Sequence, residues 1–363
     1  WCVRKCPYCD FNSHAAPDQI PQARYVDALL EDLEVDLPAL QGRALTSIFF
    51  GGGTPSLFAP EEIGRFLQRA RMLAPFAADI EVTLEANPGT IEHGRFGGYR
   101  DAGVNRVSLG AQTFDARQLE LLGRIHGSDD IRRATDELRE AGIANFNLDL
   151  MYGLPEQAPA QALADVEAAL ALGPTHLSHY QLTLEPGTVF YHRPPPLPDA
   201  DTIWQMQVEC QQRLAAHGHG QYEVSAYAQA GRRSRHNLNY WEFGDYLGIG
   251  AGAHGKLTLV DSTSREIVRT ERIRQPREYL GRPTTERTVR RHAVAAADLP
   301  FEYMLNALRL TDGFMEKSFE ARTGLPFSTL SDALALAERK GLLVSDATGR
   351  WYPTDLGQRF LND

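Results

Sequence analysis

Three cysteines stand close together at the start of the chain: Cys2, Cys6 and Cys9, in the spacing C-x3-C-x2-C. Three thiolates on one short loop can converge on a single inorganic centre. The fourth cysteine, Cys210, lies inside a helical pattern, where a small buried hydrophobic residue is expected. So few cysteines in so long a chain do not make a disulfide scaffold. The group of three therefore predicts a metal site in a reducing compartment.

Two kinds of metal centre are compatible with this loop. A structural zinc ion takes four protein ligands, and only His14 stands near enough in sequence to be the fourth. A [4Fe–4S] cluster takes one ligand per iron, so three cysteines leave one iron without a protein ligand. That iron can bind a cofactor or substrate, as an open zinc position does in catalysis. The spacing favours this cluster over a zinc-stabilised interaction module.

A glycine-rich segment is the second candidate site. Gly51-Gly52-Gly53-Thr54 comes directly after the apolar run Ile48-Phe49-Phe50. Glycines let backbone N–H and C=O groups approach a ligand without a Cβ in the way. An ordinary turn is the alternative. Because the segment follows a predicted strand and the cysteine loop, we favour a site for a ligand carboxylate or ammonium.

The elements that must position these groups alternate between strands and helices. Five short apolar runs predict strands: Thr46–Phe50, Ile80–Glu85, Arg106–Gly110, Phe146–Met151 and His176–Leu182. Amphipathic stretches between them predict helices, including Pro60–Leu73, Ser128–Ala141 and Pro159–Leu172. This order predicts parallel βαβ units that curl into a barrel or an open sheet. The strands alternate little in polarity, so we expect burial on both faces, with the chemistry at their C-terminal ends.

The rest of the chain predicts further parts. The proline-rich connector 193–198 is followed by a helix, a strand, a loop rich in glycine and aromatic residues, and a helical segment that ends in a hairpin. The expected ranges are Asp199–His217, Tyr222–Ala226, His236–Gly255, Phe301–Leu310, Met315–Thr323, Phe327–Lys340 and the hairpin 342–352. Helices followed by a hairpin resemble a winged helix. We therefore expect domains at 1–192, 193–295 and 296–363.

Charge and hydropathy exclude several classes of protein. With 37 basic and 47 acidic residues the formal net charge is −10, which disfavours a nucleic-acid or general anionic-membrane binder. The sequence shows no membrane-spanning run and no signal peptide, so a cytoplasmic location is expected. The chain begins with Trp1 rather than Met, and we expect it to be a trimmed piece. The winged-helix-like segment is expected to dock or to act as a lid, not to read DNA.

The cysteine spacing with Tyr8 before the third cysteine, followed by the glycine-rich strand end, resembles the radical S-adenosylmethionine (SAM) superfamily. In that superfamily the open iron is chelated by the methionine moiety of SAM, and the reduced cluster cleaves the sulfonium. Further segments resemble its coproporphyrinogen dehydrogenase-like family, which includes the HemW-type heme chaperones: 84–88, 108–114, 122–126 and 147–155. The resemblance implies an α/β fold, a partial (β/α)6 barrel with a C-terminal helical domain. The first strand of that barrel would lie upstream of Trp1.

The resemblance also implies roles for matching residues. Cys2, Cys6 and Cys9 would bind the cluster. The SAM site would be lined by Tyr8, Gly52, Gly53, Thr54, Glu85, Gln112, Arg124 and Asp149. Arg124 could pair with the SAM carboxylate, while a surface ion pair is its alternative. Gln112 could donate and accept, or only cap a loop. A buried carboxylate without a partner is costly, so Glu85 and Asp149 are expected to contact the ligand or to pair with Arg124.

One position separates two branches of this family. The dehydrogenase pattern continues to a fourth cysteine, C-x3-C-x2-C-x-C, and here that position is Phe11. A phenylalanine cannot replace a thiol. The sequence Cys9-Asp10-Phe11-Asn12-Ser13 is similar to the heme-chaperone branch. The oxygen-independent coproporphyrinogen III dehydrogenase is therefore the alternative, and whether the chain is an enzyme stays open.

A final motif concerns heme. His236-Asn237-Leu238-Asn239-Tyr240-Trp241 is similar to the H-N-x-x-Y-W of the chaperone branch. Imidazole is a common ligand of heme iron and aromatic rings can stack on a porphyrin, so His236, Tyr240 and Trp241 are candidate heme residues. A histidine satisfied by nearby backbone is the alternative. The resemblance implies a chaperone that binds cluster and SAM and passes heme to acceptor hemoproteins, such as respiratory ones. Peripheral membrane contact during delivery would leave no clear trace in the sequence.

Overall fold

The computed structural model describes residues 1–89, 94–261 and 265–361. Its chain divides into two units. Unit 1 contains Trp1–Leu30, Ala44–Gln221 and Ser225–Arg233, and unit 2 contains Glu31–Arg43, Tyr222–Val224 and Ser234–Asp363. Within the described ranges, no helix combines the length and the apolar character that crossing a membrane requires.

A seven-stranded sheet forms the centre of unit 1. Five parallel strands follow one another in chain order: β1 (Leu45–Phe50), β2 (Phe76–Ala86), β3 (Arg106–Gln112), β4 (Phe146–Tyr152) and β5 (His176–Gln181). The short strand β7 (Ala226–Ala228) pairs antiparallel with β5, and β6 (Gly220–Glu223) comes last in the order. The five predicted strands are all present. The predicted α/β fold with a curled parallel sheet is thereby confirmed.

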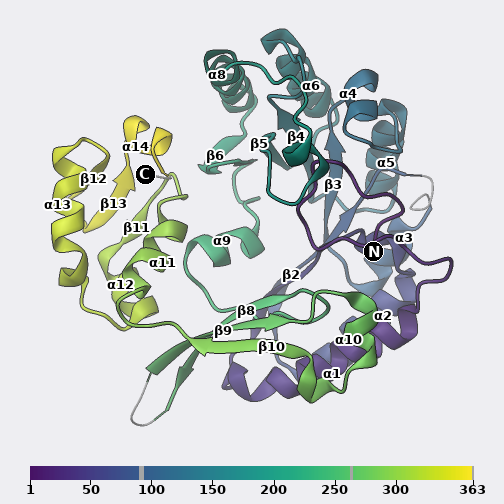
Figure 1. Ribbon diagram of the computed structural model, residues 1–363, viewed down its shortest axis with the longest axis horizontal. Helices are drawn as coiled ribbons and strands as arrows, with labels where there is room; N and C mark the ends of the chain where they lie inside the picture. The colour runs from purple at the N-terminus through teal and green to yellow at the C-terminus, as the bar shows by residue number, and fades with distance from the viewer. Residues whose placement is uncertain (90–93, 262–264, 362–363) are drawn as a thin grey trace. The chain divides into compact units, whose positions relative to one another are not determined.

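Helices cover the outer side of the parallel strands (Figure 1). They are α2 (Pro60–Leu73), α3 (Phe96–Ala102), α4 (Ala116–Leu121), α5 (Ser128–Glu140), α6 (Pro159–Ala171) and α8 (Ala200–Ala216). Met206, Cys210 and Leu214 recur every four residues on α8 and are fully buried, as a helix with one apolar face requires. Cys210 is therefore the buried hydrophobic residue that its pattern predicted. Unit 1 also contains α7 (Val189–His192) and the 3-10 turn η1 (Pro55–Leu57), and α1 covers Gln22–Leu40.

The two faces of the parallel strands differ in polarity. All seven residues of β3 are buried, which confirms the predicted burial on both faces. Because side chains alternate along a strand, Val107 and Leu109 share one face, while Ser108 and Gly110 belong to the other. Glu85 on β2 and Asp149 on β4 belong to the same polar face. The sequence thus places its polar side chains on one side of a buried sheet.

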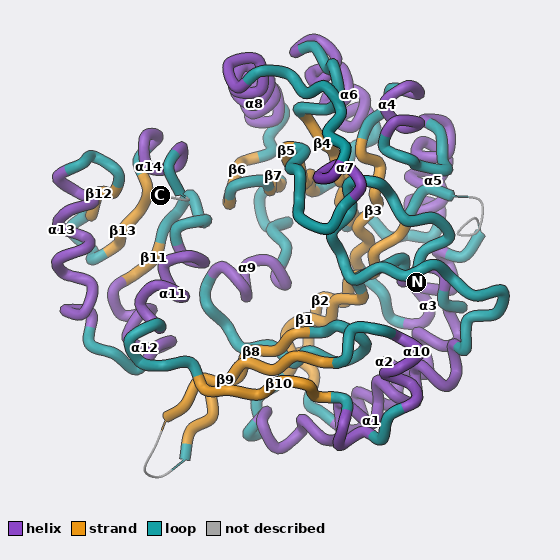
Figure 2. Tube along the Cα trace, viewed as in Figure 1, coloured by secondary structure: helices purple, strands orange, loops and turns teal. Residues whose placement is uncertain are grey.

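Unit 2 contains two small antiparallel sheets (Figure 2). The first has β8 (His254–Val260), β9 (Arg265–Arg272) and β10 (Thr288–Ala293), and the second has β11 (Phe314–Met315), β12 (Leu343–Ser345) and β13 (Arg350–Pro353). The helical elements are α9 (Arg235–Trp241), α10 (Pro276–Gly281), η2 (Thr284–Glu286), α11 (Leu299–Ala307), α12 (Glu316–Thr323), η3 (Phe327–Leu330), α13 (Ser331–Arg339) and α14 (Asp355–Arg359). Tyr303, Phe314 and Phe319 pack edge to face in its core.

Two sequence expectations in this part of the chain were wrong. The expected loop His236–Gly255 begins with helix α9, because the Ser234 hydroxyl caps the helix by accepting a hydrogen bond from the backbone N of Asn237. The expected strand Tyr222–Ala226 is interrupted, since β6 ends at Glu223 and β7 begins at Ala226. The C-terminal helices and hairpin lie where the sequence predicted them.

Candidate functional site

The cysteine loop is fixed to unit 1 by backbone hydrogen bonds. The backbone N of Cys2 donates to His14 O at 2.8 Å, and the backbone N of Thr54 donates to Trp1 O at 2.7 Å. Gly53 is needed for this contact, because a Cβ at that position would lie 2.5 Å from Trp1 O. Part of the glycine-rich segment therefore serves to dock the cysteine loop. This role was not predicted from the sequence.

A chain of hydrogen bonds joins two of the cysteines. Thr54 Oγ1 lies 3.4 Å from Cys2 Sγ and accepts from Asn87 Nδ2 at 2.9 Å. Asn87 Oδ1 in turn accepts from Arg124 Nη2 at 2.5 Å. Arg124 Nη1 then donates to Cys6 Sγ at 3.6 Å. Three motifs that are far apart in sequence thus meet around the cysteines, and Asn87, to which we gave no role from the sequence, is the residue that bridges them.

A zinc ion and a [4Fe–4S] cluster place different demands on the three cysteine sulfurs. Sulfurs bound to one zinc ion at about 2.3 Å lie roughly 4 Å apart. Among the residues that the structure describes, no three His, Cys, Asp or Glu side chains are arranged to hold one ion. His14, the fourth ligand of the zinc alternative, shares a hydrogen bond with Asn12 Oδ1 at 3.1 Å. A [4Fe–4S] cluster binds each thiolate to a different iron, so its sulfurs lie further apart than those around one zinc ion.

Two acidic side chains, Glu85 on β2 and Asp149 on β4, face the site from the polar side of the sheet, with β3 between them. Glu85 Oε2 accepts from the backbone N of Gly52 at 3.2 Å, and Asp149 Oδ1 accepts from Asn147 Nδ2 at 2.7 Å. Both are half-buried, and neither forms an ion pair within the described residues. Burial and the charge of Asp149 raise the pKa of Glu85 to about 8, and burial raises the pKa of Asp149. The charge of Arg106 offsets part of this rise for Asp149, while Glu85 has no cationic partner among the described residues, so a cationic group of a ligand could complete the site.

Arg124 does not neutralise these carboxylates, so the pairing that the sequence allowed is not formed. Its guanidinium donates to neutral acceptors, including Gly110 O at 2.8 Å, and is hydrogen-bonded to Tyr8. Its Nε is buried without a hydrogen-bond partner, and no carboxylate of the described chain pairs with it. The alternative role of Arg124, a surface ion pair, is therefore not seen among the described residues. A fixed guanidinium that has no carboxylate partner among the described residues is suited to a ligand carboxylate.

Gln112 is held in an unusual backbone conformation. Its φ of 71° is in the left-handed region, which is costly for a residue other than glycine. Tyr180 Oη donates to Gln112 Oε1 at 2.6 Å, so the side chain does not cap a loop. A Cβ at Gly110 would lie 3.0 Å from Gln112 Nε2 and 3.2 Å from Arg124 and Asn87 atoms. Gly110 thereby leaves room where three polar side chains converge, and Tyr180 is a residue that our sequence reasoning missed.

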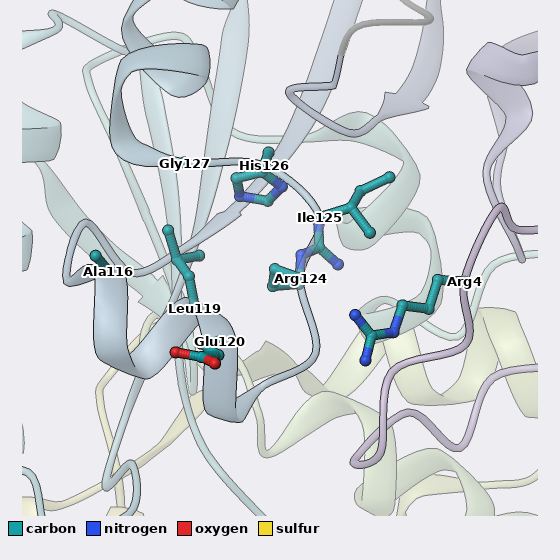
Figure 3. Close-up of a pocket in the computed structure, with 8 residues that line it drawn as sticks. All are labelled: Arg4, Ala116, Leu119, Glu120, Arg124, Ile125, His126 and Gly127. Carbon is teal, nitrogen blue, oxygen red and sulfur yellow. The ribbon is translucent and has the colours of Figure 1, made fainter.

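A pocket of about 420 Å³ lies between the cysteine loop and the segment around α4 (Figure 3). It is lined by Arg4, Ala116, Leu119, Glu120, Arg124, Ile125, His126 and Gly127. Burial and the charge of Arg124 lower the pKa of His126 to about 4, so its imidazole is neutral at pH 7. Arg4 and Arg124 are therefore the cationic groups of this pocket, with Glu120 as the acidic one. Arg124 therefore connects the pocket to the cysteine loop, since it lines the pocket and donates to Cys6 Sγ.

The candidate heme residues belong to unit 2 and form a group of their own on α9. The rings of His236 and Tyr240 pack edge to face at 4.8 Å, and those of Tyr240 and Trp241 lie 6.4 Å apart. The guanidinium of Arg309 stacks on Trp241 at 4.3 Å. The structure thus brings His236, Tyr240 and Trp241 together, as expected for consecutive turns of one helix.

The chain is similar to known families, to curated relatives and to solved structures. The radical SAM superfamily matches residues 1–169, and the HemN C-terminal domain matches residues 294–360. The heme chaperone HemW of Escherichia coli is 47% identical over all of this chain and 94% of that protein, and HemW of Bacillus subtilis is 34% identical over all of this chain and 95% of that protein. The solved coproporphyrinogen III oxidase (HemN) of Escherichia coli has a TM-score of 0.81 at 22% identity, over 99% of this chain and 86% of its own.

Proposed function

Because the chain belongs to the HemW heme-chaperone family of the radical SAM superfamily, we propose that it binds a [4Fe–4S] cluster and SAM. Cys2, Cys6 and Cys9 hold three irons of the cluster, and the fourth iron is open to SAM. When reduced, such a cluster can supply the electron that cleaves the sulfonium of SAM. Whether this chain uses that chemistry or keeps SAM as a structural ligand does not change the binding site proposed.

The observation that carries this proposal is the unmatched charge around the cysteine loop. SAM bears a carboxylate, an ammonium and a sulfonium. Arg124 offers an uncompensated guanidinium for the carboxylate, and Glu85 with Asp149 offers carboxylates for the cationic groups or for ribose hydroxyls. The remaining contacts come from Tyr8, Gly52, Gly53, Thr54 and Gln112. The charges of this site thus complement those of one ligand class.

The test is anaerobic reconstitution followed by iron and sulfide analysis and electron paramagnetic resonance (EPR). We expect about four irons per chain and a reduced-cluster signal that changes on SAM addition. Stoichiometric zinc in place of iron would overturn the cluster. A cluster signal that SAM leaves unchanged, together with no SAM binding in equilibrium dialysis, would overturn the SAM site.

We further propose that the chain carries heme and transfers it to acceptor hemoproteins, respiratory ones among them, in the cytoplasm and with peripheral membrane contact during delivery. The support is the name heme chaperone of relatives that match the whole chain. His236, with Tyr240 and Trp241 beside it, is the proposed heme contact.

We expect His236→Ala to weaken heme binding in a titration followed by absorbance. His217→Ala is the matched control, because His217 is exposed and shares a hydrogen bond with Arg213 O. Equal affinities for both variants would remove His236 from the site.

The alternative is oxygen-independent coproporphyrinogen III dehydrogenase activity. Its support is the fold shared with the solved oxidase, which at 22% identity speaks for the fold alone. Against it stands Phe11, 59% exposed, at the position of the fourth cysteine. Incubation with coproporphyrinogen, SAM and reductant is expected to give no decarboxylated product. Product formed at enzymatic rates would favour this alternative over the chaperone.

A further inference from the structure

Asn147 on β4 has a side chain whose hydrogen-bonding capacity is fully used. Its Nδ2 donates to Asp149 Oδ1 at 2.7 Å and to Ser108 Oγ at 2.8 Å. Its Oδ1 accepts from Ser178 Oγ at 3.2 Å and lies 2.6 Å from His176 Nδ1. An amide offers two N–H donors and two lone pairs, and here all four are matched. Only 1% of this residue is exposed, so water does not compete for these bonds.

The register of the sheet places these partners around Asn147. Ser108 on β3 and His176 on β5 are its direct neighbours on the two adjacent strands. Asp149 and Ser178 are neighbours one step further along the same face. Three strands therefore contribute to one polar layer that lies against Asp149. No local sequence motif can show such a layer, because it depends on which strands pair and in which register.

The orientation of the amide follows from its partners. An ionised carboxylate can only accept, so Nδ2 must face Asp149, and Oδ1 must face groups that donate. Burial and the charge of Arg106 lower the pKa of His176, which keeps its imidazole neutral. The His176 proton must then be on Nδ1 to reach Asn147 Oδ1. Asn147 thus accepts from β5 and donates to Asp149, while the Ser178 hydroxyl lies within hydrogen-bond reach of both side chains.

We propose that Asn147 is a positioning residue of the SAM site, which fixes the orientation of the Asp149 carboxylate and stabilises its ionised form toward a bound cation. This inference rests on the proposed function. Asp149 forms no salt bridge within the described residues, and its ionised form is favoured by side-chain hydrogen bonds from Asn147, Ser178 and Ser108 and by the charge of Arg106. The Ser108 hydroxyl donates to Asp149 Oδ2 at 3.2 Å, and Asn147 makes the shorter contact to Oδ1. Asn147 itself does not touch the ligand.

The alternative is that Asn147 only ties strands together. The two roles differ in their dependence on pH. Loss of a donor to the charged form raises the pKa of Asp149, so in Asn147→Ala the carboxylate becomes neutral at pH values where it is ionised in the wild type. Binding of a cationic ligand then suffers most at low pH and recovers as the pH rises. The groups that face Asp149 are Glu85 on β2, Arg106 on β3, and His176 and Tyr180 on β5.

The experiment measures the dissociation constant of SAM for the cluster-reconstituted protein from pH 6 to pH 9. We expect Asn147→Ala to weaken SAM binding by roughly tenfold or more at pH 6.5, in line with loss of a hydrogen bond to a charged group. The loss should shrink toward pH 9. Asn147→Ser keeps a hydroxyl donor, so its dissociation constant for SAM should lie between those of the wild type and Asn147→Ala. Asn145→Ala is the matched control, because Asn145 Oδ1 accepts a bond from Thr175 Oγ1 at 2.9 Å and, within the described ranges, makes no hydrogen bond to Asp149. It should leave SAM binding at the wild-type level.

Three outcomes would overturn the positioning role. They are an unchanged SAM affinity in both Asn147 variants, a loss that is the same at every pH, and an equal loss in Asn145→Ala. Iron content and thermal unfolding of each variant show whether it folds and holds the cluster, and Asn147→Ser supplies the comparison if Asn147→Ala does not. A wild-type protein that holds the cluster but binds no SAM would overturn the proposed function as well. SAM binding by the wild type that Asn147→Ala leaves intact would overturn this inference alone.

Discussion

Buried acidic residues have opposite surroundings in the two units. In unit 1, Glu85 and Asp149 form no salt bridge within the described residues, although the charge of Arg106 acts on Asp149, and burial together with the charge of Asp149 raises the pKa of Glu85 to about 8. In unit 2, Asp245 accepts from Lys256 Nζ at 2.9 Å and from Arg43 Nη1 at 2.5 Å. Burial there also opposes ionisation, but these cations lower the pKa of Asp245 to about 2.

This difference distinguishes acids that stabilise the fold from acids that await a ligand. Asp32 in unit 2 is also paired inside the protein. Arg272 and Arg287 lie 3.6 Å from its carboxylate, and Tyr279 Oη donates to it at 2.6 Å. A buried charge that is paired inside the protein contributes to folding, and one left unpaired costs free energy until a partner arrives. Burial alone would not distinguish the acidic residues of unit 1 from those of unit 2. Whether a cationic side chain pairs with the carboxylate does distinguish them.

The largest expected effect concerns the cluster around which the charges of unit 1 are arranged. Cys6→Ala should abolish the reduced-cluster EPR signal and bring iron content close to zero, because it removes one of only three protein ligands proposed for the cluster. Cys210→Ala is the control. Its sulfur is buried in α8, so the variant should lose roughly 1–2 kcal/mol of stability but keep its iron. Full iron content in Cys6→Ala would show that the cysteine loop is not the binding site.

The next effect tests the paired acid of unit 2. Asp245→Asn leaves the Lys256 ammonium buried, with 2% of its side chain exposed and its carboxylate partner gone. Removing one partner of a buried pair costs about 3–5 kcal/mol, so a large drop in the free energy of unfolding is expected in denaturant titrations. SAM affinity of the remaining folded protein should stay at the wild-type level. A loss of SAM affinity without a loss of stability would erase the distinction between the units.

Glu85→Gln should raise the stability of the ligand-free protein at high pH, in contrast to Asp245→Asn, which should lower it. The folded pKa of about 8 lies above the ordinary 4.5, so ionisation opposes folding, and stability is lost as pH rises from about 4.5 through about 8. The ligand-free variant should therefore unfold at a higher temperature than the wild type at pH 8, and the gap should close toward pH 5. SAM should bind the variant roughly tenfold more weakly at pH 8, since one carboxylate is missing. A variant that is less stable at pH 8 would mean that Glu85 is paired in solution.

Much of the fold could be predicted because burial on both faces leaves a plain sequence signal. The helix Pro60–Leu73 has the predicted bounds, and β4 differs from its prediction by one residue. The sheet β8–β10 was not predicted, since charged residues interrupt its strands. In β9, Arg265, Glu266, Arg269, Glu271 and Arg272 hide the apolar positions Ile267 and Val268. Their partners lie in distant segments, such as Asp36 for Arg272.

The candidate site divides in the same way. Cysteines, glycines and strand-end carboxylates could be singled out by type and spacing, and the structure places them around one loop. Their roles in binding stay predictions. The residues that connect them could not be found, because an amide or hydroxyl gains its role only from partners on other strands. Asn87 joins Thr54 to Arg124, and Tyr180 orients Gln112, through contacts that no spacing in the sequence indicates.

The smallest expected effect compares two tyrosine hydroxyls, one in each unit. Tyr180→Phe removes the donor to Gln112 Oε1, which leaves the amide free to rotate away from the SAM site. One hydrogen bond is worth about 1 kcal/mol, so SAM affinity should fall by roughly fivefold. Tyr246→Phe removes a hydroxyl that accepts from Arg269 Nη1 at 2.8 Å, where Glu302 already pairs with the arginine. That variant should change stability slightly and SAM affinity not at all. Equal SAM affinities in the two variants would mean that the orientation of Gln112 does not matter for the ligand, and would leave Arg124, Glu85 and Asp149 as the side chains of unit 1 that determine SAM binding.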